Sequence, residues 1–181
     1  EVGTELALNY CDVFKLPRFL VINKMDRDNA NYQKAYQSVE EYSETRLIPI
    51  QLPWGEKQDF KGVIDLLSMK AFKGQGKIAE EIPAEYKSAA EEARMKLVEA
   101  AAEGDDSLLE KYLESGSLTE EEVIRGLTEV VRSASFIPVL VSAGSSETGV
   151  FKLLDAIVDI LPSPADANKP VAQGKNGEEV L

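Results

Sequence analysis

The apolar residues of the chain follow two kinds of pattern, short uninterrupted runs and helix-spaced positions. Residues 19–22 and 136–141 are uninterrupted runs, and residues 47–52 resume a strand-like pattern. Short continuous runs are typical of strands that are buried on both faces of a parallel sheet. Helical spacing predicts helices at residues 5–14, 28–42 and 149–161. The alternation favours an α/β fold, a mostly parallel sheet with helices on both faces.

A segment of different character interrupts this pattern at residues 53–135. Residues 60–66 and 68–73 have β-like patterns and predict a small hairpin. Three helices are predicted after the hairpin, at residues 83–103, 105–113 and 119–133. Thr119 and Glu122 have the spacing of a capping box at the start of the third helix. We therefore expect an inserted α+β subdomain.

These patterns divide the chain into three parts. Residues 1–52 and 136–164 are expected to form the α/β layer, and residues 53–135 the insert. Residues 165–181 are rich in small and polar side chains and predict a linker toward a following domain. The chain begins in a helix-like pattern without an initiator Met, so we expect it to be a piece of a longer protein.

Composition and charge exclude several classes of function. The 181 residues include no histidine, which removes imidazole bases and almost every zinc constellation from consideration. The net charge of -12 repels a phosphate backbone, so we expect no direct binding of bare nucleic acid. The single cysteine forms no internal disulfide, and no apolar run approaches the roughly 20 residues that a membrane span requires. A cytoplasmic protein without membrane contact fits best.

The first polar segment with a chemical interpretation is Asn23-Lys24-Met25-Asp26, directly after a predicted buried strand. Ligands of open parallel sheets bind outside the carboxyl ends of the strands. The Asp26 carboxylate can accept hydrogen bonds from both N1–H and the 2-amino group of guanine, which adenine does not offer. Asn23 can donate to the base nitrogen N7, and the methylenes of Lys24 can cover the flat base. The same residue types are also ordinary turn formers after strands.

A second candidate loop follows the strand at residues 136–141. Ser142, Ala143 and Gly144 are small, so their backbone amides can approach a ligand oxygen such as O6 of guanine. Adenine carries a donor at that position and would leave buried groups unpaired. Taken alone, however, this triplet is an ordinary strand-to-helix turn.

Negative charge is concentrated in the predicted insert. Residues 80–122 hold 14 acidic and four basic side chains. On the first insert helix, helical spacing gathers four glutamates on one face and apolar side chains on another. These glutamates, the acidic stripe, are Glu85, Glu92, Glu99 and Glu103. The stripe is either a solvated face or a docking surface for a basic protein module.

Several segments in a fixed order resemble the translation elongation factor G family, the large GTPases that move tRNA and mRNA through the ribosome. They are residues 16–27, 60–66, 82–86, 110–113 and 154–164. The resemblance implies the carboxyl-terminal part of a P-loop GTPase-type three-layer domain with its insert. It also assigns guanine binding to Asn23, Lys24, Asp26, Ser142 and Ala143, and contact with the stalk protein of the large ribosomal subunit to the insert.

The resemblance implies GTP and GDP as ligands, with Mg²⁺ in the full-length parent. No Gly-x-x-x-x-Gly-Lys-Ser/Thr phosphate loop occurs in the 181 residues, and we find no Asp-x-x-Gly segment that could serve the magnesium site. We therefore expect no catalytic residue and no metal ligand here. The chain alone is expected to bind guanine nucleotide weakly and not to hydrolyse GTP.

Three alternatives stay open at this point. Val141 stands where the family usually has Gly, and residues 144–148 lack the family's bulky and basic residues, which leaves room for a factor-G-like paralogue. A ribosomal protection or release-factor GTPase shares the nucleotide motifs. The chain can also be a non-catalytic module that binds the ribosomal stalk through its acidic insert.

Overall fold

The computed structural model describes residues 2–163, 165, 172–173 and 179–180. The helices are α1 (Val2–Val13), α2 (Tyr32–Glu40), α3 (Ala84–Ala102), α4 (Asp106–Ser115), α5 (Glu120–Arg132) and α6 (Val150–Ile160). The strands are β1 (Leu20–Ile22), β2 (Arg46–Pro49), β3 (Gln51–Trp54), β4 (Gly62–Asp65), β5 (Lys70–Lys73), β6 (Ala79–Glu80), β7 (Phe136–Val141), β8 (Ala172–Gln173) and β9 (Glu179–Val180). Most of the predicted linker at residues 165–181 lies outside the described residues.

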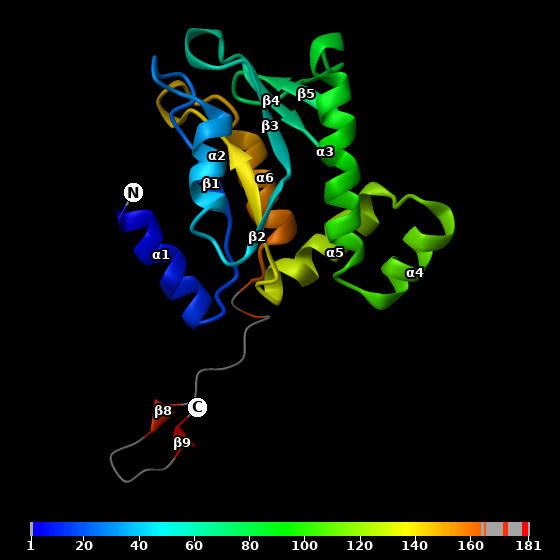
Figure 1. Ribbon diagram of the computed structural model, residues 1–181. Helices are drawn as coiled ribbons and strands as arrows, with labels where there is room; N and C mark the ends of the chain where they lie inside the picture. The colour runs from blue at the N-terminus through cyan, green and yellow to red at the C-terminus, as the bar shows by residue number, and fades with distance from the viewer. Residues whose placement is uncertain (1, 164, 166–171, 174–178, 181) are drawn as a thin grey trace.

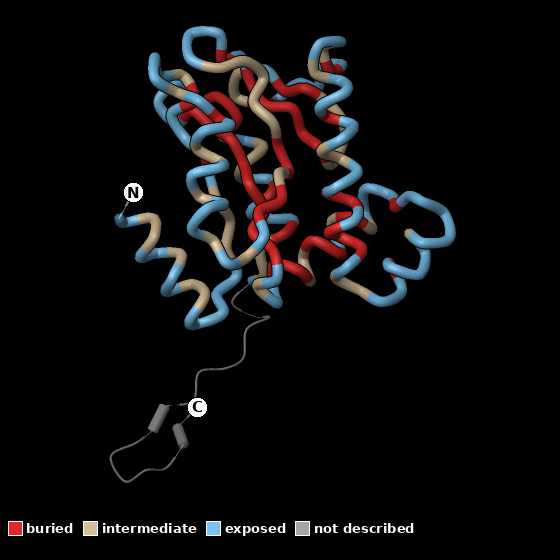
Figure 2. The backbone as a smooth tube through the Cα atoms, viewed as in Figure 1, coloured by how far each residue is buried: buried red, intermediate tan, exposed pale blue. Residues whose placement is uncertain are grey.

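The centre of the fold is a three-stranded parallel sheet in the order β1-β7-β2. Strand β7 lies between the other two, and all six of its residues are buried (Figures 1 and 2). This confirms the expectation from its uninterrupted apolar run. The helices predicted at residues 83–103, 119–133 and 149–161 are also confirmed to within a few residues as α3, α5 and α6.

Alternate residues of β7 point into two separate apolar clusters, one on each face of the sheet. Ile137, Val139 and Val141 belong to a cluster that includes Tyr32 of α2. Phe136 and Leu140 belong to a cluster built mainly from α3, α5 and α6. This alternation follows from the two-residue period of a strand. The parallel sheet therefore has helices on both faces, as the sequence predicted.

The segment at residues 47–52 was expected to be one strand, and this expectation is wrong. The structure ends β2 at Pro49, which has no N–H to donate, and starts β3 at Gln51. Strand β3 pairs antiparallel with β4, in a second sheet of order β3-β4-β5-β6. The second sheet therefore begins at Gln51, and the chain passes directly from one sheet into the other. The predicted hairpin is confirmed as β4 and β5.

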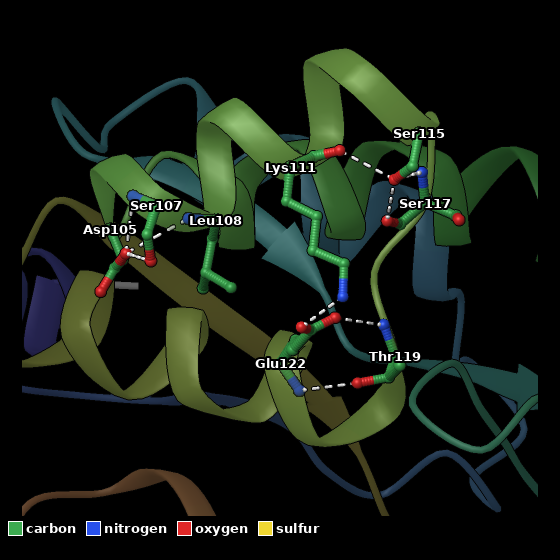
Figure 3. A network of polar contacts seen from close by, with 8 residues as sticks. All are labelled: Asp105, Ser107, Leu108, Lys111, Ser115, Ser117, Thr119 and Glu122. Atoms are coloured by element: carbon green, nitrogen blue, oxygen red, sulfur yellow. Dashed lines mark hydrogen bonds and ion pairs between the residues drawn. The ribbon is translucent and has the colours of Figure 1, made fainter.

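The helical part of the insert is held by close packing and by caps. A Cβ at Gly126 of α5 would lie 2.1 Å from the carbonyl oxygen of Ala101 in α3, so only glycine allows this helix contact. Figure 3 shows the polar contacts at the two ends of α4 and at the start of α5. The capping box of Thr119 and Glu122 is present, and Lys111 of α4 binds Glu122 at 2.6 Å.

Helix α1 is the least covered helix of the described chain. It has no buried residue (Figure 2), and its apolar side chains include Leu6, Tyr10 and Val13, which are exposed. Leu8 packs against the α2-side cluster. Within the described residues, no helix is both long enough and apolar enough to cross a membrane.

Candidate functional site

The two predicted loops meet at the carboxyl edge of the parallel sheet. Strands β1 and β7 are parallel neighbours, with Ile22 paired to Val141, so the residues after both strands emerge side by side. The Ser142 amide donates to the Ile22 carbonyl at 3.0 Å, and the Met25 amide donates to the Ser142 carbonyl at 3.3 Å. Met25 is buried and anchors the first loop.

Asn23 joins the two loops through its side chain. Its Oδ1 accepts hydrogen bonds from the amide of Lys24 at 2.7 Å and from the amide of Gly144 at 3.0 Å. It also accepts from the hydroxyl of Ser142 at 3.2 Å. Because Oδ1 is committed to these donors, the amide nitrogen of Asn23 is the group left to face a ligand.

Asp26 carries the least satisfied polar atom of the site. Its side chain is partly buried, and Oδ1 is inaccessible to solvent without a hydrogen-bond partner in the described part of the chain. A buried acceptor without a donor costs about 1–3 kcal/mol and calls for a structural or functional explanation. N–H donors of a ligand would remove this cost, and because the oxygen is inaccessible to solvent, the loop must open for them to reach it.

The loop after β7 is small and closed on itself. Ser142 and Ala143 are both buried. Ala143 and Thr148 exchange two backbone hydrogen bonds of 3.0 Å, and the Gly144 amide is bound to Asn23. The amides of residues 142–144 thus all have partners. Binding of a ligand oxygen by this loop therefore requires Ala143 or Gly144 to exchange its partner.

Basic side chains line a groove beside the first loop. This groove, of about 380 Å³, includes Asn23, Lys24, Arg27 and Lys34 among its lining residues. Lys24 has a left-handed backbone (φ 63°) and an exposed side chain. Asp26 and the Ser142–Ala143 loop do not line the groove, so this groove does not bring all five predicted residues together. Arg27 and Lys34 were missed by the sequence analysis, although Arg27 directly follows the motif.

Comparison with known proteins decides the family. The family model of the elongation factor Tu GTP-binding domain matches residues 1–163. The chain belongs to this family. Within it the chain is factor-G-like: it is 37% identical over 186 residues to elongation factor G of Mycoplasma pneumoniae (strain ATCC 29342 / M129 / Subtype 1). That match covers 100% of this chain and 27% of the relative.

A solved structure has the same fold as this chain over most of its length. A crystal structure of a Thermus thermophilus protein matches with a TM-score of 0.78 and 33% sequence identity, covering 92% of this chain and 25% of that one. The chain therefore spans about a quarter of the length of both relatives. The resemblance to the factor G family that the motifs predicted is confirmed, as is the α/β fold class.

The acidic side chains of the described residues do not gather into a metal site. The described residues contain no group of three or more His, Cys, Asp or Glu side chains that could hold a metal ion. Residues 59–62 do have the spacing Asp-x-x-Gly, which the sequence analysis did not identify. They lie where the Lys57–Asp59 turn leads into the antiparallel strand β4, within the insert.

The acidic stripe lies along α3 with all four glutamates exposed. Glu92 pairs with Lys96 at 2.7 Å on the same helix, and Glu103 pairs with Arg46 at 3.6 Å. The opposite side of α3 is buried, as predicted, through Ala90, Leu97 and Ala101. Two of the four carboxylates are therefore partly neutralised within the chain itself.

Proposed function

We propose that this chain binds the base of a guanine nucleotide with the two loops joined by Asn23. The observation that carries the proposal is Oδ1 of Asp26, a buried acceptor without a donor in the described part of a domain that matches a GTP-binding family. Guanine supplies N1–H and a 2-amino group at the spacing of a carboxylate. Adenine lacks this pair of donors, so Asp26 would select guanine.

The other predicted residues have complementary roles in this proposal. The amide nitrogen of Asn23 donates to N7, while its Oδ1 keeps the loops together. The methylenes of Lys24 lie over the base. The loop of Ser142 and Ala143 donates a backbone amide to O6, after that amide leaves its present partner.

At the level of the whole protein, we propose a factor-G-like GTPase that uses GTP to translocate tRNA and mRNA on the ribosome. The 37% identity to elongation factor G supports this proposal. Hydrolysis requires a phosphate loop and Mg²⁺ to stabilise charge on the γ-phosphoryl group. The 181 residues contain no phosphate-loop sequence, so we propose that they read the base and do not hydrolyse GTP by themselves.

We further propose that the acidic stripe contacts a basic module of the ribosomal stalk. The exposure of Glu85 and Glu99 on α3 supports this role. Binding between such charged surfaces weakens with salt, because exposed charges are screened. A module that only bound the stalk would keep this interaction without nucleotide binding.

Titration of the 181-residue chain with GDP and with ADP, followed by amide NMR shifts, tests the guanine proposal. We expect saturable shifts at residues 23–27 and 142–144 with GDP and none with ADP. Titration with the stalk domain at two salt concentrations tests the acidic stripe separately. Equal responses to GDP and ADP, or none to either, would refute guanine recognition by this chain.

A further inference from the structure

We propose that the antiparallel sheet of the insert positions both guanine-binding loops, with Gln51 and Glu56 as the positioning residues. The inference rests on the proposed function, since these loops are the ones assigned to the base. Neither side chain is expected to touch the nucleotide. Each side chain binds the backbone next to a different loop: Gln51 binds Val141 and Glu56 binds Tyr32. The two hydrogen bonds share no residue.

Gln51 replaces a missing strand partner at the end of β7. The ladder between β2 and β7 ends with Pro49 opposite Val139, and the Ile50 amide then donates to the Val139 carbonyl at 3.0 Å. The chain leaves the parallel sheet at this point, so the next β7 amide on this side, that of Val141, has no β2 backbone to bind. A side-chain oxygen takes the place of that backbone, because Oε1 of Gln51 accepts from the Val141 amide at 3.2 Å.

The environment of this contact makes it a strong constraint. Gln51 is 1% exposed, and Val141 is fully buried. Breaking the bond would leave a buried amide N–H unpaired, which costs more than the bond itself contributes. Val141 directly precedes Ser142, so the start of the second loop is fixed by a residue of the insert.

Glu56 holds the first loop from the opposite end of β3. Its Oε1 accepts a hydrogen bond from the Tyr32 amide at 2.6 Å, at the first turn of α2. A carboxylate at a helix N-terminus is favourable because the amides there have no helical partners. The adjacent Lys57 amide donates to the Met25 carbonyl at 2.7 Å, inside the Asn23–Asp26 loop. The turn after β3 is therefore bound to both ends of the segment between β1 and α2.

A third set of contacts supports the same arrangement at the turn after β5. The Gly149 amide donates to the Gly74 carbonyl at 2.8 Å, and the Phe151 amide donates to the Gln75 carbonyl at 3.2 Å. Gln75 also donates through its side chain to Glu147. The loop after β7 runs from Ser142 to Gly149. The insert sheet is therefore bound near both ends of this loop, at Val141 and at Gly149. A displacement of this sheet would move both base-binding loops together.

Hydrogen exchange and GDP titration on the same variants of the full chain test this inference. Glu56→Ala removes the acceptor, Glu56→Gln keeps one, and Gln51→Met keeps the shape of the side chain without an acceptor. Asp59→Ala, which removes an exposed carboxylate in the same turn, and Gln37→Met, at an exposed position of α2, are the matched controls. The hydrogen-exchange rates of the Lys24, Met25 and Gly144 amides report how firmly the loops are held, because these amides donate hydrogen bonds within or between the loops.

We expect exchange of these loop amides to be about threefold to tenfold faster in Glu56→Ala and Gln51→Met, as loss of one net hydrogen bond implies. The Kd for GDP should rise by a similar factor, with the preference over ADP unchanged and the protection of the distant α3–α5 helices retained. Glu56→Gln should restore both values. Loop exchange equal to that of the controls would overturn the positioning role, whereas absence of GDP binding by the unaltered chain would overturn the proposed function.

Discussion

The hydroxyl of Ser142 donates a hydrogen bond of 3.2 Å to Oδ1 of Asn23, across 119 residues of sequence. The same oxygen accepts from the Gly144 amide at 3.0 Å. One side chain thus fixes the distance between the loop after β1 and the loop after β7. In the proposed site, the carboxylate of Asp26 and the small-residue loop act on one base only while this distance is kept.

Replacement of Asn23 by Ala should therefore weaken GDP binding by more than loss of the proposed hydrogen bond from the Asn23 amide nitrogen to N7 alone. The change removes the acceptor for Lys24, Ser142 and Gly144 together, and each net hydrogen bond is worth about 1 kcal/mol. We expect the Kd measured by calorimetry to rise by about tenfold or more. Asn9→Ala on exposed α1 is the control, and equal affinities of the two variants would show that the loops hold without Asn23.

Gly126→Ala should strongly destabilise the insert. The new Cβ would lie 2.1 Å from the Ala101 carbonyl oxygen, so α3 and α5 would have to separate. Overpacking of this kind costs about 1–3 kcal/mol, and we expect the upper end because the clash is with backbone. Urea unfolding measures the loss. Gly3→Ala, where nothing lies within 4 Å, is the control, and a similar stability of both variants would contradict the close helix contact.

Thr119→Ala should remove the amino-terminal cap of α5. The Thr119 hydroxyl accepts from the Glu122 amide at 3.3 Å, and the Glu122 carboxylate accepts from the Thr119 amide at 2.9 Å. Loss of such a cap costs about 1 kcal/mol. Thr119→Ser keeps a hydroxyl and should recover most of the stability in chemical unfolding. No difference between the two substitutions would argue against the cap.

Glu122 should make stability depend on pH in the acidic range. The hydrogen bond from Lys111, helped by the backbone N–H of Thr119, lowers the pKa of Glu122 from 4.5 to about 2. The folded-state pKa lies below the unfolded one, so the stabilisation is complete above pH 4.5 and is lost as the pH falls toward 2. The unfolding free energy of Glu122→Gln should therefore fall less steeply over this window. Parallel curves for both proteins would contradict the assignment.

The central strand of the parallel sheet could be predicted from local pattern because β7 is buried on both faces, whereas Val21 of the edge strand β1 is 37% exposed. Residues 136–141 are apolar without interruption, and the structure makes all six of them β7. The break at Ile50 could not be predicted in the same way. Apolar residues continue through residues 47–50 and resume at Leu52 after Gln51, so composition does not show which partner strand each residue takes.

The contact between the candidate loops followed from one general rule, since parallel neighbours end at the same edge of the sheet. Asn23, Asp26 and Ser142 could therefore be grouped before their distances were known. Gln51 and Glu56 could not be assigned to this group from the sequence. Each is a single polar residue outside any motif, and its partner, Val141 or Tyr32, is brought near only by the passage of the chain between the two sheets.

The most direct measurement of the central claim is the base preference of Asp26→Asn. Xanthine has a carbonyl where guanine has the 2-amino group, so an amide in place of the carboxylate would accept from N1–H and donate to that carbonyl. We predict that the variant binds GDP about tenfold to a hundredfold more weakly and binds xanthosine diphosphate more tightly than the unaltered chain does. Unchanged GDP affinity, or loss of GDP binding without any gain for xanthosine diphosphate, would contradict recognition of guanine by Asp26.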